Sequence, residues 1–196
     1  RLCWNGDAEG SGTCTGTLVA NTGASASGTP GTEWACTKDN HTNLIWSLQT
    51  VSGISWNDAT SPAGGSPIAA HNGASRCGFA TDWRVPTRRE LLSIVHHGAY
   101  SPAIDGAYFP ATVNSWYWTN DSYAPDPANA WVVNFSNGYA VAYGKANPGH
   151  VRLVRSGQWF GALDALDAAP VLSALGVTGT TTTATTLQAT SNEAAT

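Results

Sequence analysis

Apolar and polar positions alternate most clearly in the stretch NAWVVNFSNGYAVAYGK of the second half of the chain. Alternation places Val132 and Asn134 on one face of a strand. Trp131, Val133 and Phe135 then lie on the other face. The tripeptide SNG between the two apolar runs is typical of a hairpin turn, so this stretch predicts two paired strands.

Further runs rich in β-branched and aromatic residues predict other strands. They are a strand, turn and strand at residues 34–50, single strands at 115–123 and 150–157, and a short strand-like run at 14–23.

The strongest helix pattern covers residues 87–98. Thr87 and Glu90 form a capping box, and apolar residues follow at helical spacing. Gly98 marks the expected end of this helix, and Pro86 keeps the entering chain extended. A second, shorter helix is expected over SWNDAT, with Ser55 as its N-cap. The following stretch, SPAGGSPIAAHNGAS, is expected to be a loop.

These patterns divide the chain into three parts. Residues 1–32 form a cysteine-bearing N-terminal arm rich in Gly, Ser and Thr. Residues 33–157 carry the predicted strands and helices. Residues 158–196 form a low-complexity C-terminal extension, with a weak helix pattern at 158–177 and a Thr-rich tail beyond it. Because threonine favours strands, the tail is a candidate strand for the sheet of another subunit.

Composition narrows the classes of function. Charged residues make up 11% of the chain, against roughly 25% in an ordinary globular protein. The net charge of −4 argues against binding to nucleic acid. No apolar run is long enough to span a bilayer. The sequence starts at Arg1, as expected after removal of a signal peptide, and we expect a secreted, extracellular or cell-surface protein.

The chain has four cysteines: Cys3, Cys14, Cys36 and Cys77. Their spacing matches no zinc pattern. An even number in a charge-poor secreted chain favours two disulfides. Three pairings can be drawn, and Cys3–Cys14 with Cys36–Cys77 is favoured because the first bond would close a short Gly-rich loop.

Four phrases of the sequence, taken in order, resemble the Lcl C-terminal-domain family, named for the last domain of a bacterial collagen-like adhesin. They are WACTKDNHTNLIWS, CGFATDWRVPTRRELLSIV, SPAIDGAYFPATVNSWYWTNDSY and AWVVNFSNGYAVAYGKANPGHVRLVRSG. The resemblance implies an α+β, C-type-lectin-like fold, in which two short helices flank a small twisted antiparallel sheet. It also implies a secreted or surface-attached bacterial protein.

The best-known member of this family is a trimeric adhesin that binds sulfated polysaccharides. This chain has a net charge of −4, which would repel sulfate groups, so we do not infer the same ligand for it. Related lectin-like folds include formylglycine-generating enzymes, which need cysteines late in the domain. No cysteine follows Cys77, so we expect no enzyme of that kind.

The residues point to no catalytic constellation. His96 and His97 are adjacent near the end of the predicted helix, so they point to different sides and make a poor chelate. We interpret them as helix-end histidines favoured by the helix dipole. We therefore expect a non-catalytic protein without an obligatory cofactor.

Calcium is the metal that one predicted loop would take, because its side chains carry the oxygen ligands that calcium prefers. These residues are Asn120, Asp121, Asp126 and Asn129. Solvated turn residues are the alternative interpretation.

Aromatic residues on the late strands are candidates for a ligand surface, because sugar rings stack on such side chains. Strand alternation sends about half of them inward. The candidates for an outward surface are Tyr139, Tyr143, Lys145, Asn147 and Trp116.

Other residues of the resembling phrases are expected to be structural. We expect Arg84 and Arg152 to be buried or half-buried and to pair with Asp82 or with backbone carbonyls. The remaining members of this set are Trp83, Pro86, Trp118 and Trp131.

Two functions remain open. One is a structural or adhesive subunit of an extracellular fibre or pilus-like assembly, which binds copies of itself or another surface subunit through the C-terminal extension. The other is a stand-alone carbohydrate-binding adhesin domain. A fibre subunit predicts a tail buried against another chain, whereas a lectin predicts an exposed groove lined by aromatic residues or calcium.

Overall fold

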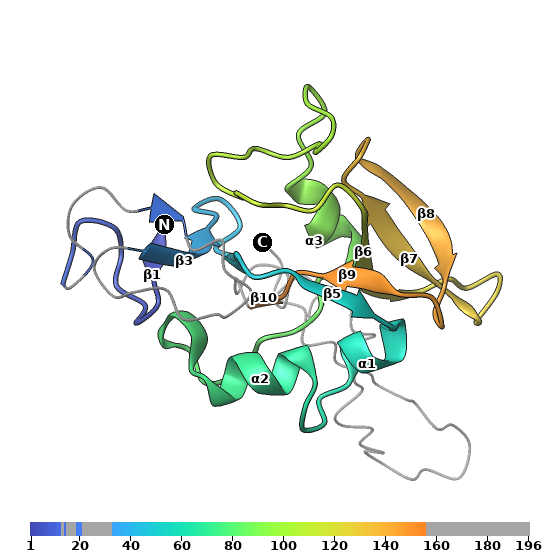
Figure 1. The fold of residues 1–196 in the computed structure, drawn as a ribbon, viewed down its shortest axis with the longest axis horizontal. Helices are drawn as coiled ribbons and strands as arrows, with labels where there is room; N and C mark the ends of the chain where they lie inside the picture. The colour runs from blue at the N-terminus through green and yellow to red at the C-terminus, as the bar shows by residue number, and fades with distance from the viewer. Residues whose placement is uncertain (13, 15–18, 21–32, 156–196) are drawn as a thin grey trace, which may run out of the picture. The chain divides into compact units, whose positions relative to one another are not determined.

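Figure 1 shows the computed structural model of the chain. The residues that it describes are 1–12, 14, 19–20 and 33–155. All of them belong to the first of two units, residues 1–157. The second unit, residues 158–196, lies outside the described part. The expected helix at 158–177 and the Thr-rich tail therefore remain predictions, as do the boundaries of the three parts.

The described residues form ten strands and four short helices, so the protein is α+β. The strands are β1 (Leu2–Cys3), β2 (Val19–Ala20), β3 (Glu33–Lys38), β4 (Ile45–Ser47), β5 (Val51–Ile54), β6 (Trp116–Ser122), β7 (Asn129–Asn134), β8 (Tyr139–Gly144), β9 (Gly149–Val151) and β10 (Val154–Arg155). The helices are α1 (Trp56–Thr60), α2 (Pro67–Gly73), the 3₁₀ helix η1 (Arg76–Gly78) and α3 (Arg88–Ser93).

The strands form two five-stranded sheets. The first has the order β1-β3-β4-β10, with β2 paired to β3, and the second has the order β5-β9-β6-β7-β8. Two pairs, β2–β3 and β6–β9, are parallel, and the other pairs are antiparallel. The expectation of a single small antiparallel sheet was therefore wrong, as was the number of helices.

Residues 150–157, predicted as one strand, explain why there are two sheets. Within the described residues this segment divides into β9 and β10, which belong to different sheets. The side chain of Arg152, between the two strands, is fully buried and donates to the carbonyl oxygen of Ser47 at 3.1 Å. The segment therefore crosses from the second sheet to the first, instead of continuing in one of them.

The predicted hairpins are present. β3 pairs with β4 from Cys36↔Ser47 to Lys38↔Ile45. β7 pairs with β8 in a regular register that begins at Asn134↔Tyr139. Gly138 in the turn has a φ of +80°, and an added Cβ atom there would meet a Val95 methyl at 2.6 Å. The turn thus needs glycine for both its backbone conformation and its close packing.

Two helices differ from the expectation. α1 begins after Ser55 as predicted, but α2 lies in the stretch expected to be a loop. The Ser66 side chain accepts from the backbone N–H of Ala69, and Pro67 occupies the first turn. This is a standard helix start inside a Gly-rich sequence.

α3 is shorter than predicted. The capping box of Thr87 and Glu90 is present, but the helix ends at Ser93. Its end thus lies five residues before the expected stop at Gly98, and Val95 already forms a β-bridge with Ile104. The interpretation of His96 and His97 as helix-end residues was consequently wrong, and both side chains are exposed.

The main hydrophobic core is built from both sheets and α1. β7 contributes Val132 to it, on the same face as Trp118 of β6. The opposite face of β6 and β7 carries the buried Tyr117 and Val133, and α3 packs on these two strands, as Figure 1 shows. The second sheet is thus covered on both faces at β6 and β7.

Two disulfides fasten the first sheet, and their pairing is the one favoured from the sequence. Cys3 is bonded to Cys14, and Cys36 to Cys77. An added Cβ atom at Gly6 would lie 2.7 Å from the carbonyl oxygen of Cys77. The N-terminal arm is therefore held by direct backbone packing beside the second disulfide, as well as by its own.

Candidate functional site

β8 forms an edge of the second sheet (Figure 1). Its six residues pair with β7 in unbroken register, from Asn129↔Gly144 to Asn134↔Tyr139. Its sequence, YAVAYG, contains no charged residue and no proline. Natural proteins usually block a sheet edge with lysine, proline or a bulge. β8 carries none of these and, among the described residues, it pairs on one side only.

One face of β8 continues into a partly exposed aromatic surface. Register and alternation place Trp116, Tyr139, Val141 and Tyr143 on this side of the sheet, which we call the aromatic face. The Trp116 and Tyr143 rings stack at 5.7 Å between centroids with 8° between their planes. Both rest on the core, whereas Tyr139 at the start of β8 is 69% exposed.

Lys145 and Asn147, predicted to share an outward surface with these tyrosines, lie in the turn after β8. Lys145 Nζ lies 4.1 Å from the centroid of the Trp56 ring and donates to the Ser122 hydroxyl at 2.7 Å. The Asn147 side chain is exposed. The five predicted residues therefore do not form one binding surface. Trp116 and Tyr143 are joined, Lys145 is directed to α1, and Tyr139 lies at the other end of β8.

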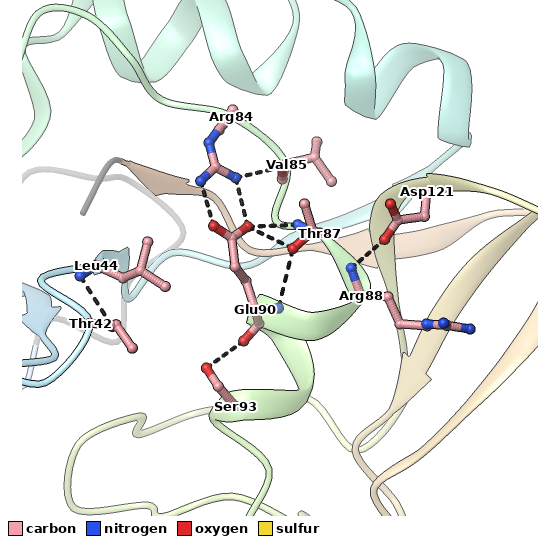
Figure 2. Close-up of polar contacts among 9 residues, drawn as sticks. All are labelled: Thr42, Leu44, Arg84, Val85, Thr87, Arg88, Glu90, Ser93 and Asp121. Atoms are coloured by element: carbon pink, nitrogen blue, oxygen red, sulfur yellow. Dashed lines mark hydrogen bonds and ion pairs between the residues drawn. The ribbon is translucent and has the colours of Figure 1, made fainter. Parts of the chain in front are cut away.

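The predicted calcium ligands are used within the fold. Asp121 accepts from the backbone N–H of Arg88 at the start of α3 (Figure 2). Asp126 instead accepts from the side chain of Asn129 at 2.7 Å within its own turn, and Asn120 is exposed. Within the described part of the chain, no group of three or more His, Cys, Asp or Glu side chains could hold a metal ion.

Arg84 was predicted to pair with Asp82 or with backbone carbonyls; it pairs with Glu90 and also donates to the Val85 carbonyl oxygen at 3.5 Å. Figure 2 shows the two guanidinium nitrogens of Arg84 facing both carboxylate oxygens of Glu90, at 2.7 and 2.5 Å. Burial raises the pKa of Glu90, but the hydrogen bonds from Arg84 and Thr87 outweigh it and hold this pKa below its ordinary value. Asp82 binds Arg155 at 3.3 Å. The Arg84–Glu90 pair therefore anchors the start of α3, so its role is structural.

The other residues predicted to be structural lie in or beside the core. Trp83, Pro86 and Trp118 are buried, and Trp118 Nε1 donates to the Ile54 carbonyl oxygen at 2.9 Å. Trp131 is half-buried, with the Arg88 guanidinium 4.1 Å from its ring centroid.

Two buried basic residues beside Arg152 were missed from the sequence. Arg152 was expected to bond to backbone carbonyls, and it does. His71 and Arg76, which are also buried, were not singled out. Burial and then the charge of Arg76 lower the pKa of His71 to about 3, so this imidazole is neutral at neutral pH. The available signal was the position of Arg76 directly before Cys77 in a disulfide-bonded chain.

None of the helices in the described residues is long and apolar enough to cross a membrane. The two disulfides fit a protein of an oxidising, extracellular environment.

Comparison with known proteins matches the chain to one family model. A search of curated proteins found no match. The Lcl C-terminal domain matches residues 35–155, which include most of β3, every later strand through β10, the aromatic face and the buried arginines, but not β1 and β2. The chain therefore belongs to the Lcl C-terminal domain family.

Proposed function

We propose that this protein is a non-catalytic, secreted bacterial surface protein that serves as a structural or adhesive subunit of an extracellular fibre or pilus-like assembly. Neighbouring copies join when the C-terminal extension of one adds a strand to the β8 edge of the next. The proposal includes a C-type-lectin-like arrangement of the domain. It assigns the domain to binding and assembly, with no chemical step.

The open edge of β8 is the observation that carries this proposal. An edge of six regularly paired residues offers backbone N–H and C=O groups to an incoming strand. The incoming strand would meet no charged side chain on β8. The exposed Tyr139 and the half-buried Tyr143 give side-chain contacts on one face of that edge.

The sequence of the extension supports it as the occupant. Residues 178–192, TGTTTTATTLQATSN, contain no charge and no proline, and threonine favours strands. Strand addition takes its affinity from main-chain hydrogen bonds, so it tolerates such a simple sequence. Two uncharged partners also avoid the repulsion that like charges in facing strands produce.

A carbohydrate-binding adhesin domain is the alternative, and the exposed ring of Tyr139 supports it. The stack of Trp116 on Tyr143 supports it less, because each ring covers a face that a sugar would need. The contacts of Lys145 with Trp56 and Ser122 likewise occupy its charged end. We therefore place assembly before glycan binding.

Negative-stain electron microscopy of the unconcentrated full chain tests the proposal. We expect filaments from the full chain and discrete particles from a chain that ends at Gly157. We also expect Ala142→Lys to abolish filaments, because it puts a charge on an exposed position of β8. The matched control is Ala63→Lys, which puts the same charge on an exposed loop between α1 and α2 and should leave filaments intact.

Discrete particles from the full chain would contradict assembly and favour the glycan-binding alternative. Filaments that survive both the truncation and Ala142→Lys would show an assembly that uses neither the extension nor β8.

A further inference from the structure

Two arginines lie inside the protein without an acidic partner among the residues that the structure describes. Arg152 is 0% exposed and Arg76 is 1% exposed. The ion pairs found among the described residues are Arg1–Glu9, Arg84–Glu90 and Arg155–Asp82. Neither buried arginine belongs to any of them. Arginines of this kind are rare in proteins, because an uncompensated charge is expensive to remove from water.

Both arginines are held close to Ser47 on β4. Arg152 reaches it directly, through the hydrogen bond from Nη1 to the Ser47 carbonyl oxygen. Arg76 reaches the same place through the disulfide, because its neighbour Cys77 is bonded to Cys36. Cys36 in turn lies opposite Ser47 in the β3–β4 register. The disulfide places the backbone of Arg76 in this part of the fold, and the charge of Arg152 acts on the Arg76 guanidinium, so the two groups lie in the same interior region.

The neutral groups around the two arginines accept only some of the hydrogen bonds that the guanidinium groups can donate. Arg152 Nη2 donates to the hydroxyl oxygens of Thr50 at 3.3 Å and Thr112 at 3.0 Å. Arg152 also has a side-chain hydrogen bond with Tyr117. Within the described part of the chain, Arg152 Nε has no hydrogen-bond partner, and neither have Nε and Nη1 of Arg76. The Arg76 guanidinium does lie 5.7 Å from the centroid of the Trp4 ring, but a ring supplies only a weak attraction for a cation at this distance.

Electrostatics strengthens the case for a missing negative charge. Burial lowers the pKa of Arg76 to about 10, and the positive charge of Arg152 contributes in the same direction. Burial also lowers the pKa of Arg152. Arg76 nevertheless remains protonated at neutral pH, so two cations share a region from which water is excluded. Hydroxyl groups, carbonyls or a buried water would satisfy donors but would not compensate charge.

We propose that the protein binds one small monovalent anion, chloride in an extracellular setting, against the free donors of Arg76 with the charge of Arg152 close by. A monovalent ion fits better than phosphate or sulfate, because the cost of removing an ion from water rises with its charge. Since both arginines are covered, the ion is enclosed as the two sheets close around Ser47. It acts as a structural part of the core.

Crystallography with bromide in place of chloride gives the direct test. The full chain is crystallised in sodium bromide, and anomalous scattering is measured at the bromine absorption edge. We expect an anomalous peak within contact distance of Arg76 Nε or Nη1. A water molecule alone, or a carboxylate of the chain itself, at that place would overturn the proposal.

Thermal unfolding gives an independent test in solution. The Tm of the wild-type protein is compared in sodium chloride and in sodium methanesulfonate at equal ionic strength and pH. We expect a higher Tm in chloride, by on the order of 5 °C, because a ligand that binds the folded state stabilises it. A wild-type Tm that does not depend on the anion would contradict the proposal.

Arg76→Met should remove the difference between the two salts, because it removes the donors and the charge. Arg89→Met is the matched control, since Arg89 is an exposed arginine on α3, and it should keep the wild-type difference. A chloride effect that persists in Arg76→Met would place the anion elsewhere and overturn the assignment. If Arg76→Met fails to fold, the bromide experiment on the wild-type protein still decides.

Discussion

At the scale of single residues, His71 has its protonation state fixed by its neighbours. Its Nδ1 lies 2.9 Å from the Pro67 carbonyl oxygen, which can only accept a hydrogen bond, so Nδ1 carries the proton. Nε2 then accepts from the Ser47 hydroxyl at 3.0 Å. Burial, together with the charge of Arg76, keeps the imidazole neutral. His71 is therefore a neutral link between α2 and β4.

This protonation state predicts a pH dependence of stability. The pKa of His71 is about 3 in the folded protein, below its ordinary value of 6.5. The unfolded chain takes up a proton at pH 6.5 that the folded protein refuses until much lower pH. The stabilisation is thus fully present above pH 6.5 and is lost as the pH falls. We expect the free energy of unfolding to fall by about 2–3 kcal/mol from pH 6.5 to 4.5 through this residue.

Urea denaturation across this pH range measures the effect. His71→Gln keeps a donor and an acceptor but does not titrate, so its slope should be smaller than that of the wild type. His150, whose pKa burial also lowers, contributes equally to both proteins. His96→Gln, at an exposed position, should keep the wild-type slope. Equal slopes for wild type and His71→Gln would show that His71 titrates normally.

At the scale of elements, α3 is too short to be stable on its own. Isolated helices shorter than about 12 residues are marginal in water, and α3 runs only from Arg88 to Ser93. Three contacts at its start compensate: the capping box, the Arg84–Glu90 pair and the acceptance by Asp121 of the Arg88 N–H. Since α3 packs on β6 and β7, its start also fixes one face of the second sheet.

We expect Thr87→Ala to lower the free energy of unfolding by about 1 kcal/mol, because it removes the side-chain oxygen that caps α3. Thr87→Ser keeps that oxygen and should change stability little. Chemical denaturation of both variants measures the difference. Equal losses in the two variants would assign the effect to the lost methyl group and not to the cap.

Local signals explain which elements could be predicted from the sequence. The capping box of α3 and the SNG hairpin each depend on residues within one short stretch, and both are present. The end of α3 depends on the bridge from Val95 to Ile104, and the split between β9 and β10 depends on Arg152 reaching Ser47. Such contacts leave no periodic trace, so the sequence pattern extended both elements too far.

The candidate site likewise combines features that depend on one strand with features that depend on contacts between elements. Tyr139 and Tyr143 lie on one face of β8 because they are four positions apart, which is a property of a single strand. The stack of Trp116 on Tyr143 and the contact of Lys145 with Trp56 join separate elements. Whether these side chains face solvent or each other depends on the packing of β6, β8 and α1, which no local pattern encodes.

At the scale of the whole molecule, the two disulfides constrain the unfolded chain to different extents. Cys36 and Cys77 are 41 positions apart, and their bond joins β3 to η1. Cys3 and Cys14 are 11 positions apart and both lie in the N-terminal arm. Cross-linking a longer loop removes more entropy from the unfolded state, which stabilises the folded protein more.

The double variant Cys36→Ala/Cys77→Ala is therefore expected to lose about 4 kcal/mol of stability. The corresponding loss for Cys3→Ala/Cys14→Ala is about 3 kcal/mol, which makes it the matched comparison. Urea denaturation without reducing agent measures both. The reverse order would mean that native packing around the N-terminal arm, and not loop entropy, determines the contribution of each bond.

The crossing segment from β9 to β10 also sets the order of events when the chain is made. β9 is the strand between β5 and β6, and β10 pairs with β4. Arg152 and Ser47, which meet there, are 105 positions apart. On the ribosome, the second sheet cannot be completed until β9 has emerged, and the first not until β10 has emerged. Pairing across so long a loop is slow. The earlier strands therefore leave the ribosome before their partners exist, so a nascent chain that stops before β9 exposes the unpaired edges of β5 and β6.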